Sequence, residues 1–308
     1  MTICNQDENM VFFMENGAVD TYALTATSAA VNHPVTELQN TSRRLTWRST
    51  SLAANTITGN WTTPITPEAN LRGRKVGIVF INHNFPKNIA GDYTNINVKL
   101  YDSTLTLRIN ENFTGVNFSG MGYKEETAIG LIRPYKNRVI YIAGATEFDL
   151  RRCEITLTGV GALAGVTNWE IGRLYVGPIF QPADNVYWEN DKLGAVDDTR
   201  VSFSRGGDQF SDYGSKRRGV YLEPPASLVT QSDISYWMYL IHVIGSRTPI
   251  FVDVHPRIAG DFGPSEISEA YLNLLWQVYG IANNNIRFGR RASNVMSVTG
   301  SMQIVEQA

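Results

Sequence analysis

The chain of 308 residues contains only two cysteines, Cys4 and Cys153. Two cysteines give no disulfide framework of the kind that holds small secreted domains together. Cys153 lies in a strand-like run and Cys4 near a polar terminus, so we expect both to be free thiols. Free thiols indicate synthesis in a reducing compartment. We therefore expect a protein stabilised by a packed core, for which the length is ample.

Long apolar runs are also missing. The first residues, MTICNQDE, carry neither a basic nor an apolar stretch, so no export signal is expected. No segment approaches the ~18 consecutive apolar residues of a membrane span. Without an export signal, the Asn-x-Thr triplets at residues 60–62 and 112–114 are interpreted as chance occurrences, not as glycosylation sites. We expect synthesis in a cytoplasm and no contact with a membrane.

Charge is scarce as well. Charged residues make up 18% of the chain, below the ~25% typical of globular proteins. The formal net charge of −2 excludes a general polyanion-binding protein, so no nucleic-acid partner is expected. Aromatic residues at 11%, together with so small a net charge, exclude a disordered chain. Asn, Ser, Thr and Gly replace the missing charges, which favours a β-rich, turn-rich protein.

Strand-like patterns fill the first part of the chain. Residues 75–81 (KVGIVFI) form a continuous apolar run, which predicts a strand buried on both faces. Residues 95–102 alternate polar and apolar side chains, as a half-buried strand does. Similar runs separated by Gly, Pro and Asn predict an antiparallel β-sandwich over residues 21–182, after an N-terminal arm at residues 1–20. The predicted fold class is mainly β, with a smaller α+β region.

The composition of the sequence changes near residue 180, after which polar residues predominate and long apolar runs are few. We therefore predict a C-terminal α+β assembly domain over residues 183–308. Its strongest helix pattern covers residues 232–245, with capping residues at both ends. The predicted apolar face of this helix consists of Ile234, Trp237, Met238, Ile241 and His242.

Other C-terminal segments give strand signals. The run between Pro249 and Pro256 predicts a strand, and residues 297–306 predict a terminal strand or hairpin. Residues 264–280 fit a helix and a strand equally well.

The sequence contains fragments of catalytic and metal-binding motifs, but none has the structural context that such a site requires. Residues 159–164 (GVGALA) fit the dinucleotide fingerprint, but the next strand begins too soon for the helix that the fingerprint needs. Residues 82–84 (NHN) hold one histidine with no second ligand at metal spacing. The neighbouring Asp197 and Asp198 would point to opposite faces of a strand. We predict no enzyme, no catalytic residue, no metal and no cofactor.

Residues 205–219 combine glycines with basic and aromatic side chains. Such a segment can bind single-stranded nucleic acid, but the interleaved Asp208 and Asp212 favour a partner-facing loop. Arginines pair with carboxylates, and aromatic residues are enriched at interface hot spots. The residues predicted to contact a partner are Arg205, Phe210, Tyr213, Arg217 and Arg218.

Four segments are distinctive as a set: residues 45–49 (LTWRS), 76–86 (VGIVFINHNFP), 98–102 (VKLYD) and 172–177 (GRLYVG). Together they resemble a group of tailed-bacteriophage virion proteins that carry a discoidin-like, or galactose-binding-like, β-sandwich. The resemblance covers about residues 30–180, and residues 202–306 are more loosely similar to the partner region of tail and baseplate components. The family implies a structural role in the particle and no catalytic residue.

The residues and the resemblance together suggest a virion structural subunit of the tail tip or baseplate. Such a subunit would be made in the bacterial host cytoplasm and would assemble with copies of itself and other tail proteins. The alternative is a carbohydrate- or receptor-binding module on the virion that contacts a host-surface glycan, and a glycan hydrolase is the third hypothesis. Exposed Trp or Tyr at loop tips would favour glycan binding, apolar patches on several faces would favour assembly, and convergent carboxylates would favour an enzyme.

Overall fold

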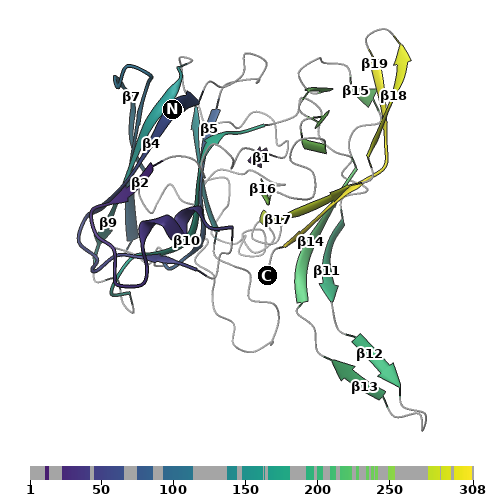
Figure 1. The fold of residues 1–308 in the computed structure, drawn as a ribbon, viewed down its shortest axis with the longest axis horizontal. Helices are drawn as coiled ribbons and strands as arrows, with labels where there is room; N and C mark the ends of the chain where they lie inside the picture. Colours follow the sequence, from purple (N-terminus) through teal and green to yellow (C-terminus); the bar gives the residue numbers. More distant parts are fainter. Residues whose placement is uncertain are drawn as a thin grey trace, which may run out of the picture.

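The computed structural model arranges the chain as five antiparallel sheets (Figure 1). It describes residues 11–13, 23–41, 45–65, 75–85, 93–113, 137–143, 148–161, 163, 166–180, 192–197, 200–203, 209–212, 216–223, 227–228, 234–235, 237–238, 240–241, 249–253, 277–284, 286–292 and 295–306. The mainly β fold predicted from the sequence is confirmed.

Two of these sheets form the predicted sandwich, at the left of Figure 1. The five-stranded sheet has the order β2 (Ala23–Ala26), β4 (Asn55–Ile65), β9 (Leu150–Val160), β6 (Tyr93–Tyr101) and β7 (Leu107–Phe113). The four-stranded sheet has the order β3 (Trp47–Arg48), β10 (Glu170–Pro178), β5 (Lys75–His83) and β8 (Asn137–Ala143). A short 3₁₀ helix, η1 (Val35–Gln39), precedes β3.

Strand β5 explains the continuous apolar run in the sequence, because it lies between β10 and β8 and both of its faces are covered. On one face, a Cβ at Gly77 would come within 2.2 Å of the Phe13 ring, so this position admits only glycine without rearrangement. Alternate residues point the other way, which turns Ile78 and Phe80 into the interior of the sandwich. Both are fully buried, as the sequence predicts for a central strand.

A six-stranded sheet has the order β1 (Val11–Phe13), β16 (Ile250–Asp253), β17 (Gln277–Asn284), β20 (Met302–Glu306), β14 (Lys216–Leu222) and β11 (Lys192–Asp197). One side of this sheet, formed by its strands β1, β16 and β17, packs against the second face of the four-stranded sheet. The fully buried guanidinium of Arg173 on β10 lies 5.7 Å from the ring of Tyr279 on β17 and donates a hydrogen bond of 2.8 Å to the Gln39 carbonyl. The four-stranded sheet is therefore the middle layer of three.

Strand β1 lies within residues 1–20, which the sequence predicts to be an N-terminal arm. Its two aromatic side chains are nevertheless buried, one on each side of the strand. Phe13 packs edge-on against Tyr175 and Phe251, in the core shared with the sandwich. Phe12 stacks against Phe180 and packs edge-on against Trp237, in a second core. Pairing with β16 and with Phe180 satisfies the strand's backbone groups. Phe12 and Phe13 therefore join two hydrophobic cores.

The predicted helix at residues 232–245 is present in part. Residues 234, 235, 237 and 238 are α-helical and residues 240 and 241 are π-helical. The buried stripe is Ile234, Trp237 and Leu240, whereas Met238 is 37% exposed, so the predicted apolar face is wrong at that position. Packing of Trp237 on Phe12 and Phe180 fixes the rotation of the helix. His242 lies outside the described residues.

The remaining strands form two small sheets. One has the order β15 (Ser227–Leu228), β19 (Val295–Thr299) and β18 (Arg287–Ala292), and the other pairs β12 (Arg200–Phe203) with β13 (Gln209–Asp212). The predicted terminal strand or hairpin is two strands, β19 and β20, which belong to different sheets and are separated by Gly300 with φ 97°. The strand predicted between two prolines is β16. Of the ambiguous segment at residues 264–280, residues 277–280 are the start of β17, and residues 264–276 lie outside the described residues.

Candidate functional site

The outer face of the five-stranded sheet carries mostly uncharged polar side chains. Along β9, Cys153, Ile155 and Leu157 are buried, while Glu154 and Thr156 between them are partly exposed. The same alternation holds in β4 and β6. The residues that share this face, called the Asn/Thr face below, are Thr56, Thr58, Asn95, Asn97, Lys99, Asn110, Asn112, Glu154, Thr156 and Thr158.

One row of the Asn/Thr face crosses four strands without a charge. The register places Thr56 beside Thr156, Thr156 beside Asn97, and Asn97 beside Asn112. With strands about 4.8 Å apart, the row is roughly 14 Å long. The hydroxyls of Thr56 and Thr156 are hydrogen-bonded at 2.8 Å, which fixes both side chains.

Asn97 organises the centre of this row. Its amide nitrogen donates to the side-chain oxygens of Asn110, at 2.9 Å, and Asn112, at 3.0 Å. Its amide oxygen receives no hydrogen bond from the part of the chain that the structure describes. In the next row, the ammonium of Lys99 forms no ion pair with a described residue. The face therefore offers hydroxyl and amide groups that are fixed by hydrogen bonds, together with the Lys99 ammonium, and the hydrogen-bonding capacity of these groups is not used up by the described residues.

A charged cluster borders the Asn/Thr face where β6 and β9 meet. The Tyr101 hydroxyl donates to a Glu154 carboxylate oxygen at 2.9 Å, and Arg152 pairs with the other oxygen. The Arg152 guanidinium also lies 5.5 Å from the centre of the Tyr101 ring. Burial raises the pKa of Tyr101, and the hydrogen bond to Glu154 and its negative charge raise it further. The phenol stays protonated and can only donate to this carboxylate, so the cluster holds a fixed geometry.

The turn after β6 is held by one carboxylate. An Asp102 oxygen accepts hydrogen bonds from the Thr104 amide and hydroxyl and from the Thr106 amide, and the other oxygen accepts from Arg108. These bonds, led by that from the Thr104 hydroxyl, hold the pKa of Asp102 well below its usual range, although its partial burial opposes this. The four hydrogen bonds to Asp102 hold the turn in which Leu105 has φ 63°. Leu105 is 54% exposed at the tip of this turn.

We expect Asp102→Asn to destabilise the protein at neutral pH. The folded pKa is depressed, so the carboxylate stabilises the folded state above its unfolded pKa of about 3.9 and loses that effect as the pH falls toward the folded pKa. Denaturant unfolding at neutral pH and at about pH 3 should show the gap between wild type and variant narrowing in acid. Glu111→Gln on the neighbouring strand is the control. An equal gap at both pH values would contradict the role of the charge.

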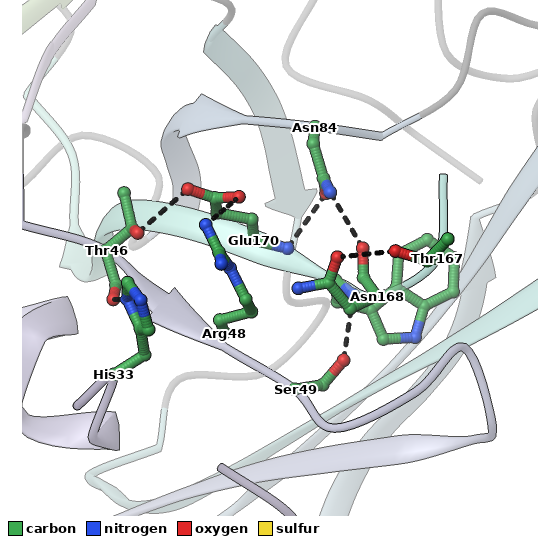
Figure 2. Close-up of polar contacts among 9 residues, drawn as sticks. His33, Thr46, Arg48, Ser49, Asn84, Thr167, Asn168 and Glu170 are labelled. Carbon is green, nitrogen blue, oxygen red and sulfur yellow. Dashed lines mark hydrogen bonds and ion pairs between the residues drawn. The ribbon is translucent and has the colours of Figure 1, made fainter. Parts of the chain in front are cut away.

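A second polar cluster lies at one end of the sandwich (Figure 2). Glu170, the first residue of β10, accepts from the Thr46 hydroxyl at 2.9 Å and from Arg48 at 3.1 Å. The His33 Nδ1 lies 2.9 Å from the Thr46 carbonyl, so this nitrogen carries the proton. The Arg48 Nε is buried and has no hydrogen-bond acceptor among the described residues.

The side chains of the neighbouring Asn84 and Ser49 form hydrogen bonds with backbone groups. Asn84 accepts from the Glu170 amide at 2.8 Å and donates to the Asn168 carbonyl at 2.7 Å (Figure 2). Ser49 accepts from the Trp169 amide at 2.8 Å and donates to the Ser51 carbonyl. These bonds tie the ends of β3, β5 and β10 together, so this cluster stabilises the sandwich and leaves few groups for a ligand.

The predicted partner-contacting loop at residues 205–219 is corrected by the structure. Phe210 lies in strand β13, and Arg217 and Arg218 lie in β14, where they pair with Val196 and Ala195 of β11. Arg205 and Tyr213 lie outside the described residues. The Gly- and Arg-rich composition suggested a solvated loop, but the second half of β14 buries Val220 and Leu222 and anchors it as a strand. Contact with a partner stays a prediction.

The glycine-rich segment at residues 159–164 begins within β9, and its residues 162 and 164 lie outside the described residues. Gly159 belongs to β9, and a Cβ there would come within 2.4 Å of Leu163. Gly161 has φ 83°, and strand β10 starts at Glu170. Leu163 packs into the sandwich core, so this apolar residue of the motif serves packing. Cys153 is a free thiol, as expected, and burial raises its pKa to about 12, which keeps it protonated.

The described residues contain no group of three or more His, Cys, Asp or Glu side chains placed to hold a metal ion. Nor does any helix among them combine the length and the apolar character needed to cross a membrane. The four tryptophans of the described part, Trp47, Trp61, Trp169 and Trp237, are buried.

Comparison with known proteins gives similar solved structures but no related sequence. No protein-family model matches it, and no curated protein sequence matches it. Similar solved structures include the lectin domain of lectinolysin complexed with Lewis B antigen, with 10% identity, TM-score 0.33 and coverage of 54% of this chain and 97% of that one. Another is the family 32 CBM of NanJ from C. perfringens in complex with galactose, with 11% identity, TM-score 0.32 and coverage of 55% and 98%.

A third similar structure is the enzymatically active domain of tailspike protein 4 of bacteriophage CBA120. It has 12% identity and a TM-score of 0.28, and the match covers 54% of this chain and 20% of that chain. At such identities and TM-scores these likenesses carry no argument about function.

Proposed function

We propose that the chain is a non-catalytic glycan-binding protein that holds neutral oligosaccharides on the Asn/Thr face. The observation that carries this proposal is the uncharged row of Thr56, Thr156, Asn97 and Asn112, whose side chains are already fixed by hydrogen bonds. Sugar hydroxyls both donate and accept hydrogen bonds, as these side chains do. Fixed side chains lose little conformational freedom on binding, which favours affinity for a small ligand.

The groups around the row fit the same role. Lys99 and Glu154 are direct cross-strand neighbours in the next row. Their opposite charges offset each other, so the face stays close to neutral. Tyr101 borders the face as a partly exposed aromatic residue. The carboxylates of Glu154, Glu170 and Asp102 are each engaged by an arginine, which supports binding without hydrolysis.

Replacing Asn97 with Ala should weaken the binding of short linear neutral oligosaccharides about tenfold, because one or two hydrogen bonds of ~1 kcal/mol each are lost. Titration of glucose-, galactose- and N-acetylglucosamine-based oligosaccharides by calorimetry measures this change. Asn283→Ala, which removes an exposed asparagine from β17, is the matched control and should bind as wild type does.

Two results would contradict the proposal: no heat of binding with any of these sugars, or equal affinity for wild type and Asn97→Ala. A third variant tests the ligand's charge. Lys99→Met should leave binding of neutral sugars within about twofold, because the proposed contacts come from the Thr and Asn side chains of the row and an ammonium has no opposite charge to pair with on a neutral ligand. A complete loss of neutral-sugar binding in Lys99→Met would show that the Lys99 ammonium, and not the uncharged row, carries the binding.

A second candidate is a structural subunit of a phage virion, in the tail tip or baseplate and carried to the particle from the host cytoplasm. The observation that favours it is the β12–β13 ribbon, which forms a sheet of its own and extends away from the rest of the molecule at the lower right of Figure 1. A projecting ribbon of this kind suits assembly with neighbouring subunits. Cryo-electron microscopy of purified particles tests this candidate, and absence of the protein from them would remove it.

A further inference from the structure

The uncharged row of the Asn/Thr face extends to a fifth strand at β2. Leu24 is buried and Ala26 packs against the core, so Thr25 and Thr27 turn toward the outer face of the sheet. The Thr27 amide donates to the Thr56 carbonyl at 3.0 Å, which continues the β2–β4 register and places Thr27 beside Thr56. Strand by strand, the extended row therefore consists of Thr27, Thr56, Thr156, Asn97 and Asn112.

Both ends of this five-residue row are open. Strands β2 and β7 are the edges of their sheet, and no other described strand pairs with the outer side of either. Thr27 and Asn112 at the two ends are exposed, and the three residues between them are half-buried. With strands about 4.8 Å apart, the row is roughly 19 Å long. A ligand longer than the row can therefore run past both edges of the sheet, as an internal stretch of a polymer does.

The spacing of the strands matches the advance of an extended sugar chain. A β-1,4-linked chain of glucose or N-acetylglucosamine has equatorial linkages, is nearly straight, and moves forward by about one strand spacing per sugar. An α-1,4-linked chain coils and loses this match within a short distance. Successive sugars of the extended chain face opposite ways. The hydroxyls and amides of the row supply both donors and acceptors, so either edge of a sugar finds a partner.

The twist of the sheet favours a single chain over a crystalline surface. Neighbouring strands are rotated by ~20–25°, so the row turns by roughly 80–100° about its own axis between Thr27 and Asn112. A flat, rigid surface such as crystalline cellulose can touch only part of a row that turns in this way. A single dissolved chain rotates about its glycosidic bonds and can follow the whole row.

We propose that the five-residue row binds an internal stretch of a single, dissolved β-1,4-linked glycan chain that runs across the strands. This inference rests on the proposed function and adds the linkage, the direction and the length of the ligand. About four or five sugars, at one strand spacing each, fill the row. Thr27, at one end, contacts the ligands that are long enough to reach it.

Chain length and linkage give the first test, by calorimetric titration of the full chain. The β-1,4-linked hexasaccharide of glucose should bind about tenfold more tightly than the trisaccharide, because it reaches more of the hydrogen-bonding residues. The α-1,4-linked hexasaccharide should gain less than about twofold over its own trisaccharide. Crystalline cellulose should not pull the protein down. Equal gains in the two series, no gain in the β-1,4 series, or retention on crystalline cellulose would overturn the inference.

A variant at one end of the row tests the direction of the chain. Thr27→Val removes the hydroxyl and keeps the shape of the side chain, so it should weaken binding of the β-1,4 hexasaccharide about fivefold and that of the trisaccharide less. Thr25→Val is the matched control, because Thr25 lies on the same strand and face but in the neighbouring row, beside Thr58. It should change neither affinity. A larger loss in Thr25→Val than in Thr27→Val would place the chain along another line and contradict the inference.

The same titrations distinguish failure of this inference from failure of the proposed function. If Asn97→Ala weakens sugar binding but length, linkage and Thr27→Val have no effect, the face binds sugars and the inference alone is wrong. If no sugar binds the wild-type chain, both are wrong.

Discussion

Ile78→Asp should abolish soluble, folded protein. Ile78 is fully buried in the interior of the sandwich, on the central strand of the middle layer. A buried carboxylate with no partner costs several kcal/mol, while the whole folding free energy of a domain is about 5–15 kcal/mol. The loss of the isoleucine side chain adds its own share of about 2–5 kcal/mol. The two effects together exceed what the fold can tolerate.

The measurement is soluble yield, followed by circular dichroism of whatever protein is recovered. Val31→Asp is the matched control, because Val31 is 85% exposed and the same change there should leave yield and Tm nearly unchanged. A soluble Ile78→Asp variant that melts cooperatively near the wild-type Tm would show that β5 is not central to the fold.

Phe13→Ala should give the second-largest loss of stability, about 3–5 kcal/mol, although it changes a residue close to the N-terminus. The Phe13 ring fills the space above Gly77 and packs against Tyr175 and Phe251, so its removal leaves a cavity between the middle layer and the six-stranded sheet. Thermal unfolding should show a Tm roughly 10 °C lower.

Hydrogen exchange locates this effect. The amides of β1 and β16 should lose protection first, because the cavity lies at their contact with β10. Leu105→Ala, at a side chain that is 54% exposed, should change stability by less than ~0.5 kcal/mol. A Phe13→Ala variant as stable as this control would mean that β1 does not anchor the third layer.

Much of the sandwich could be predicted because its signals are local. Alternation in residues 95–102 predicted β6 and therefore the polar outer side chains Asn97 and Lys99. The apolar run at residues 75–81 predicted a strand covered on both faces, and the structure explains it by a sheet packed on either side. The identity of the second covering layer could not be predicted, because it comes from residues far along the chain.

The C-terminal half departs from the sequence prediction for identifiable reasons. β14 begins with Lys216, Arg217, Arg218 and Gly219, a sequence typical of loops, and only its pairing with β11 and β20 makes it a strand. The rotation of the helix near Trp237 depends on two phenylalanines, Phe12 and Phe180, that a helical pattern does not contain.

The candidate binding surface could be predicted only strand by strand. The Thr and Asn residues are visible in the sequence, but the row that joins Thr56, Thr156, Asn97 and Asn112 depends on the register of four strands. Register follows from burial of the opposite face and from turn geometry, which act over the whole sheet. The bond between Arg48 and Glu170 likewise joins residues far apart in the chain.

The position of β1 sets the order of events during synthesis on the ribosome. Phe13 leaves the ribosome early, but its pairing partner Phe251 is made roughly 240 residues later. At a synthesis rate of about 5–20 residues per second, β1 is without its partner strand β16 for on the order of 10–50 seconds. The sandwich strands are complete well before that, so the apolar face of β5 and β10 stays uncovered while the rest of the chain emerges. The nascent chain therefore exposes an aggregation-prone apolar surface. A chaperone, or a loose collapse of the later segments onto that surface, must cover it until the last strands are made.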